Sequence, residues 1–97
     1  MLRRKDVEAK LAKSDLLMRA ARLDELGKGE RLWQSTKVAE AEKLLQPLVE
    51  KSEQLELDIR LVVLASLATV YEARGKAAEA KAMRLRSIGE VETAVPR

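Results

Sequence analysis

The chain has 97 residues, which is enough for one domain with a modest hydrophobic core. It is 46% hydrophobic and 36% charged, with one Trp, one Tyr and no Phe, a composition typical of amphipathic helices around an aliphatic core. The absence of Cys and His excludes disulfides, thiol and imidazole catalysis and the common zinc ligands, and a net charge of +3 is too low for a dedicated nucleic-acid binder.

An N-terminal helix is the first predicted element, and we expect one long helix from about residue 4 to residue 26. Apolar residues recur at helical spacing from Val7 onwards, and neither Gly nor Pro interrupts the segment. Two shorter helices are the alternative, because Ser14 and Asp15 are typical of a helix cap. Residues 1–22 carry seven Lys or Arg against three Asp or Glu, so this helix is either a solvated basic face or a contact surface for an acidic partner.

Two glycines, Gly27 and Gly29, follow this helix, and each destabilises a helix interior by ~1 kcal/mol relative to Ala. They either end the helix or permit close packing, and the repeat described below favours close packing at Gly29. Residues 35–36 are typical of a turn and helix cap. Residues 37–54 then predict a helix that is kinked or broken near Pro47, because proline removes a backbone donor and clashes with the carbonyl four residues earlier.

The most hydrophobic segment predicts a helix over about residues 57–74. Its apolar residues cover more than one face, so we expect this helix to be central and packed on two sides. Gly75 suits the left-handed position after its end, and a last helix follows over about residues 76–91. Residues 93–97 are expected to be frayed. No stretch has the period of a strand, so the predicted fold class is all-α, with about four helices in antiparallel hairpins.

The sequence repeats internally. The stretch TKVAEAEKL at 36–44 matches GKAAEAKAM at 75–83. Four residues recur unchanged 39 positions later: Lys37, Ala39, Glu40 and Ala41 return as Lys76, Ala78, Glu79 and Ala80. A period in this range is a signature of stacked supersecondary units.

Residues 61–92 resemble a tetratricopeptide repeat, in which two antiparallel helices pack closely at small residues. The matching positions are Leu64, Leu67, Ala68, Tyr71, Ala80 and Ser87. Arg84 and Glu92 depart from the pattern, where the family has a large apolar residue and a proline. An Arg at that position indicates a last helix with no following repeat to pack against, as in a terminal capping element.

Residues 22–53 match the same pattern more weakly, at Gly29, Leu32, Ala41, Leu45 and Leu48, and depart from it at Glu25 and Lys28. The period of 39 exceeds the family's usual length of about 34, which implies longer helices. The resemblance therefore implies a single domain built as a right-handed stack: an N-terminal helix over about residues 1–21, a degenerate repeat over 22–53, a clearer repeat over 57–92 and a frayed tail over 93–97.

The resemblance implies that the chain binds another protein. First helices of such repeats line a concave groove, which here would be formed by Leu23, Leu26, Glu30, Trp33, Val62, Ala65, Ser66, Thr69 and Glu72. These mostly apolar and small side chains suit an amphipathic helix or an extended apolar peptide. Trp33 is the best single candidate for contact, because Trp is enriched at binding hot spots; a core position is its alternative. Chaperone-binding members clamp a carboxylate with Lys and Asn, and this chain has no Asn.

We therefore expect a non-enzymatic, cofactor-free interaction module in the cytoplasm, an adaptor, assembly factor or chaperone-like binder, with no membrane span. Two alternatives stay open. One is a structural oligomerisation domain, and the other is a basic helical bundle that binds nucleic acid or another anionic partner through Arg3, Arg4, Lys5 and Lys13. Interleaved acids and the scarcity of aromatics for base stacking count against nucleic acid.

The number of repeats bears on self-association. About three repeats are usually needed to bury a continuous core, and the chain has fewer. We expect either that the N-terminal helix covers the exposed face, or that a second copy or a permanent partner does.

Overall fold

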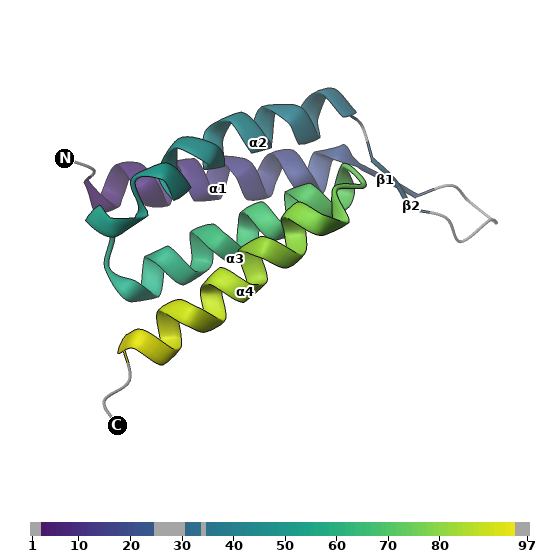
Figure 1. Ribbon diagram of the computed structural model, residues 1–97. Coiled ribbons are helices and arrows are strands. Elements are labelled where there is room, and N and C mark those ends of the chain that lie inside the picture. The colour runs from purple at the N-terminus through teal and green to yellow at the C-terminus, as the bar shows by residue number, and fades with distance from the viewer. Residues whose placement is uncertain (1–2, 25–30, 34, 95–97) are drawn as a thin grey trace.

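A computed structural model describes residues 3–24, 31–33 and 35–94. Its helices are α1 (Arg4–Ala21), α2 (Ser35–Glu50), α3 (Leu57–Ala73) and α4 (Ala77–Ala94). Short strands β1 (Arg22–Asp24) and β2 (Arg31–Trp33) lie between α1 and α2, and the 3-10 turn η1 (Ser52–Gln54) lies between α2 and α3. The predicted all-α class is confirmed, because helices form all the packed layers (Figure 1).

The four helices form two antiparallel hairpins that lie side by side. α1 packs against α2, α3 packs against α4, and α2 joins the two hairpins by packing against α3, while α1 touches α3 more lightly. α1 and α3 run in the same direction, and α4 lies on the side of α3 away from α1 (Figure 1). The result is an elongated molecule of 50 × 28 × 17 Å.

The core is aliphatic, as the composition predicts. Its largest fully buried side chains include Leu45 and Leu48 of α2 and Leu64 and Leu67 of α3. α3 buries residues towards both neighbouring helices, which agrees with the central position predicted for it. Burial of each such leucine stabilises the fold by about 1.5–3 kcal/mol, so these two helices contribute most of the core.

The repeated sequence occupies the same place in both hairpins. Residues 36–44 lie in the first part of α2, and residues 75–83 lead into and begin α4. Ala41 and Ala80, which the repeat aligns, are both buried. A small side chain at each position allows the second helix of its hairpin to approach its neighbours closely.

The structure corrects the prediction for residues 22–24 and 31–33, which were expected to be helical. This segment was expected to continue the N-terminal helix and to form the first helix of a repeat, but β1 and β2 pair antiparallel, with Arg22 opposite Trp33 and Leu23 opposite Leu32. Two glycines in the segment disfavour a helix by ~1 kcal/mol each, and strand pairing supplies partners for the backbone groups. α1 occupies the place beside α2 that the expected helix would have taken. Close packing at Gly29 lies outside the described residues.

Two other predictions about helix ends are settled by the backbone. The break considered at Pro47 is wrong, because α2 continues through this proline to Glu50. Proline leaves the carbonyl of Lys43 without its helical donor, and both residues are exposed, so water can take the donor's place. α4 continues to Ala94, so the first two residues of the expected frayed tail are helical.

The connections around α3 are held by specific hydrogen bonds. Gly75 has φ of 73°, and the N–H of Lys76 donates to the carbonyl of Tyr71 at 2.8 Å, which closes the end of α3 as predicted. At the start of α3, Arg60 Nε donates to the carbonyl of Ser52 at 3.0 Å. Arg86 Nη2, from α4, donates to Ser52 Oγ at 2.6 Å. The turn between the hairpins is therefore fastened from both helices of the second hairpin.

In the part of the chain that the structure describes, no helix combines the length and the apolar character needed to cross a membrane.

Candidate binding groove

An open groove follows the seam between α1 and α3. A cavity of about 220 Å³ near the N-terminal ends of both helices is lined by Arg4, Glu8, Leu11, Asp58, Ile59 and Val62. A second cavity of about 120 Å³, further along the same helices, is lined by Ser14, Asp15, Met18, Ser66 and Thr69. We call these two sets of side chains together the α1–α3 groove.

The floor of the groove is apolar. Ile59 and Met18 are buried, and Leu11 is partly buried against the core. Val62 is the exception, because half of its surface (50%) is exposed to solvent inside the groove. A half-exposed Val beside buried apolar neighbours gains stability when a partner covers it.

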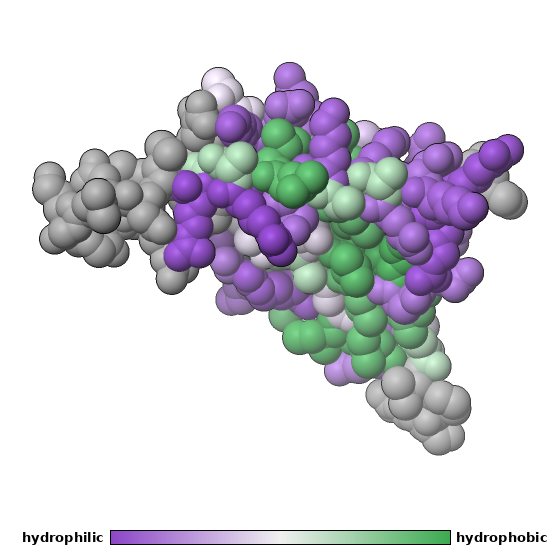
Figure 2. Space-filling model, turned by 180° about the vertical axis from the view of Figure 1, so that it is seen from behind, coloured by the Kyte–Doolittle hydropathy of each residue, from purple (hydrophilic) through white to green (hydrophobic). Residues whose placement is uncertain are grey.

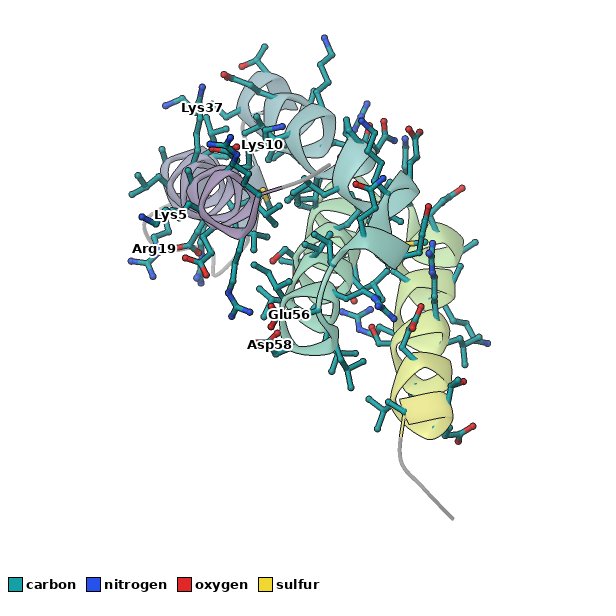
Figure 3. All side chains as sticks on the ribbon, turned by 90° about the vertical axis from the view of Figure 1, so that its left-hand side faces the viewer. Lys5, Lys10, Arg19, Lys37, Glu56 and Asp58 are labelled. Atoms are coloured by element: carbon teal, nitrogen blue, oxygen red, sulfur yellow. The ribbon has the colours of Figure 1, made fainter. Side chains whose placement is uncertain are left out.

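One end of the groove is closed by a cluster of charges centred on Arg4. Its guanidinium contacts Glu8 at 2.8 Å, Glu56 at 2.9 Å and Asp58 at 2.7 Å, and so joins α1 to the start of α3. Figure 3 shows Glu56 and Asp58 on the side of α3 that faces α1. The hydrogen bond from Arg4 is the main cause that lowers the pKa of the Asp58 carboxyl, and the same carboxylates raise the pKa of Arg4.

Carboxylates outnumber cations along the groove. Glu8, Asp15 and Asp58 line it, whereas Arg4 is its single lining cation among the described residues. Asp15 is also paired with Arg19 at 3.0 Å, at the outer edge. The groove therefore combines an apolar floor with a mildly acidic rim.

The α3 residues predicted for the groove fall on the exposed side of that helix. Val62, Ser66 and Thr69 line the groove. Ala65 is exposed beside it and accepts a hydrogen bond from Thr69 Oγ1 at its carbonyl (3.1 Å). Glu72 instead forms an ion pair with Arg84 of α4.

Two of the residues predicted from the first repeat lie in the short strands. Leu23 lies in β1 and Trp33 in β2, while Leu26 and Glu30 lie outside the described residues. The opposite wall comes from α1, one element earlier in the chain than predicted. Sequence reasoning missed residues that recur three and four positions apart along α1: Leu11, Ser14, Asp15 and Met18.

The four basic residues of the alternative surface are not brought together. Arg4 turns into the groove and is neutralised by carboxylates. Arg3 precedes α1, and Lys5 and Lys13 are exposed. Lys5 and Lys13 are eight residues apart, which separates them by about 80° around α1 and by roughly 12 Å along it. Lys5 and Arg19 lie on the outer side of α1 in Figure 3, away from the other helices.

A second polar cluster joins α2 to the end of α3. Glu42, only 7% exposed, contacts Arg74 at 2.7 Å and Lys76 at 3.4 Å. The Lys76 ammonium lies 5.6 Å from the ring centre of Tyr71, whose hydroxyl accepts a hydrogen bond from Gln46 at 3.4 Å. Every member has a partner within the fold, so we interpret this cluster as structural.

The described residues contain no group of three or more Asp or Glu side chains placed to hold a metal ion. Comparisons of the chain with protein-family models, with curated proteins and with solved structures found no match.

Proposed function

We propose that the protein is a non-enzymatic interaction module that binds a helical or extended segment of another protein in the α1–α3 groove. The observation that carries this proposal is the half-exposed Val62 above an apolar floor between two parallel helices. Apolar surface removed from water contributes roughly 25 cal/mol per Å², so a partner side chain that covers this floor is stabilised there.

We also propose a tetratricopeptide-like stack as the framework of the groove. The first helix of each hairpin lines it, and the repeated sequence lies at the start of each second helix. Both features are expected of such a stack, in which first helices form the binding face.

Other ligand classes fit the groove less well. Its cavities, of about 220 and 120 Å³, are smaller than the roughly 300–1,000 Å³ of small-molecule pockets. Glu8, Asp15 and Asp58 would repel the phosphates of a nucleic acid. An amphipathic segment can insert a single apolar side chain into each small cavity, and it carries no phosphates for the carboxylates to repel.

A pair of matched variants tests the proposal. Val62→Glu adds a charge inside the groove, whereas Leu16→Glu adds the same charge at a side chain 65% exposed on α1 and outside the groove. Circular dichroism first establishes that both variants keep wild-type helicity.

Proteins are then captured from a lysate at high salt on immobilised wild type and on each variant. We expect a partner that is retained by wild type and Leu16→Glu and lost with Val62→Glu. Equal retention by a folded Val62→Glu variant would contradict the groove. Capture at low salt only, abolished by nuclease, would support the basic-helix alternative instead.

A further inference from the structure

The internal repeat aligns α2 with α4, so each residue of α2 can be compared with the residue 39 positions later in α4. Four residues along one face of α2 are buried: Val38, Glu42, Leu45 and Val49. Glu42 contacts Arg74 and Lys76 at the end of α3, so this face is turned towards the second hairpin. Their counterparts 39 positions later in α4 are all exposed: Ala77, Lys81, Arg84 and Ile88. The two hairpins thus present equivalent surfaces, one covered by α3 and one open.

The open surface continues onto α3. Ion pairs between Glu72 and Arg84, and between Arg60 and Glu90 at 2.5 Å, set how the antiparallel helices align. This alignment places Leu61 and Ala65 of α3, half-buried and exposed respectively, near the level of Ile88, which is 55% exposed. Apolar side chains gather over the lower part of Figure 2, where α3 and the C-terminal half of α4 lie.

We propose that this surface binds an amphipathic helix of a partner protein, in the way that the first hairpin binds α3. We call it the end face, formed by Leu61, Ala65, Ala77, Lys81, Arg84 and Ile88. It adjoins the α1–α3 groove at Ala65 but shares no lining residue with it, so the proposal does not depend on the function of that groove.

The charges on the end face determine which partner helix can bind there. In the covered surface, Glu42 accepts contacts from Arg74 and Lys76 at the end of α3. The end face carries Lys81 at the position of Glu42, and Arg84, which is already paired with Glu72, at the position of Leu45. A helix bound in the same way therefore needs an apolar stripe and carboxylates, where α3 has cations.

The same reversal of charge disfavours a second copy as the occupant. If copies stacked end to end, α1 of the next copy would take the place that α3 takes in the first hairpin. α1 is the basic helix, with Arg19 in its last turn, and this would bring a cation towards Lys81. Like charges brought together at an interface suppress that pairing.

The test uses two fluorescent synthetic peptides of residues 57–76, which cover α3 and its cationic end. One has the natural sequence, and the other carries Arg74→Glu and Lys76→Glu. Anisotropy titration with the full chain should show that the charge-reversed peptide binds about tenfold or more tightly than the natural one. Ile88→Arg should abolish binding, whereas Leu16→Glu, on α1 and outside both surfaces, should leave it unchanged.

A charge swap in the protein completes the test. Lys81→Glu should reverse the order of the two affinities, so that the natural peptide binds more tightly than the charge-reversed one. An unchanged order would show that the peptide displaces α3 instead of binding the end face, and would overturn the proposal. Sedimentation equilibrium that shows a dimer of the wild type, dissociated by Ile88→Arg, would assign the end face to a second copy and would overturn it equally.

Discussion

Arg4 illustrates how the role of a residue depends on its position on the helix. The sequence places it within a basic run, and the structure surrounds it with Glu8, Glu56 and Asp58. Its charge is therefore used within the molecule, where it joins α1 to α3 and fixes one end of the groove. Lys5, the next residue, points away from the bundle (Figure 3).

The Arg4–Asp58 pair gives a pH dependence with a definite sign. The pKa of Asp58 is lowered from 3.8 in the folded protein, so the fold favours the ionised carboxyl. This contribution to stability is present above pH 3.8 and is lost as the pH falls through the lower folded pKa. Urea unfolding at a series of pH values should show Asp58→Asn less stable than wild type at neutral pH, with the difference vanishing in acid. Glu92→Gln, remote from Arg4, should show no such convergence.

Glu42 should matter more than the exposed acids of the same helix. Glu42→Gln weakens contacts to both Arg74 and Lys76, and hydrogen bonds to charged groups contribute about 1.5–3 kcal/mol. Because both cations are partly exposed, we expect a loss of about 1–2 kcal/mol in the free energy of unfolding. Glu40→Gln, at an exposed neighbour on α2, should change it by less than ~0.5 kcal/mol. Equal effects of both substitutions in urea denaturation would contradict this assignment.

Among the elements, the second hairpin could be predicted from the sequence and the connection in the first could not. α3 has a strong apolar pattern, and Gly75 marks its end with a chemical reason that needs no tertiary context. β1 and β2 have three residues each, which is too short to show a strand period. The repeat pattern favours close helix packing at Gly29 and assigns the first wall of the groove to residues 22–33, whereas the described residues of that wall belong to α1.

Substitution of the two described glycines by alanine should change the stability of the protein in opposite directions. Gly75 has a positive φ, and no atom lies within 4 Å of an added Cβ, so Gly75→Ala is disfavoured by the backbone alone, by about 1–2 kcal/mol. Gly89 lies inside α4 with the same free space, so Gly89→Ala should stabilise the protein by up to ~1 kcal/mol. Thermal unfolding of both variants checks the signs, and a lower midpoint for Gly89→Ala would show that the end of α4 is not helical in solution.

For the whole molecule, the sequence indicates a repeat but not how far its two halves differ. The match between 36–44 and 75–83 predicts two similar hairpins. It does not reveal that α3 covers one of them and leaves the other open, because coverage depends on what packs next. Four of the five large apolar side chains that are most exposed in the described residues belong to the second hairpin: Val62, Leu85, Ile88 and Val91.

Because of this asymmetry, we expect the same substitution to have very different effects on stability at positions that the repeat aligns. Val49 is buried and Ile88 is 55% exposed, although the repeat aligns them. Val49→Lys buries an unpaired ammonium and should destabilise the protein by roughly 3 kcal/mol or more. Ile88→Lys should change the free energy of unfolding by less than ~0.5 kcal/mol. Guanidinium titration of the two variants compares them directly, and similar losses would mean that the end of α4 is covered in solution.

The fastening of Ser52 by Arg60 and Arg86 has a mechanical consequence. The turn that links the hairpins is the natural place for a hinge, yet guanidinium groups from α3 and α4 hold it. Bending there would break both bonds at once, and α2 also packs directly against α3, so we expect the two hairpins to move as one rigid body. The separation of α1 and α3 is then set before any partner arrives, and binding in the groove would spend little free energy on reshaping the protein.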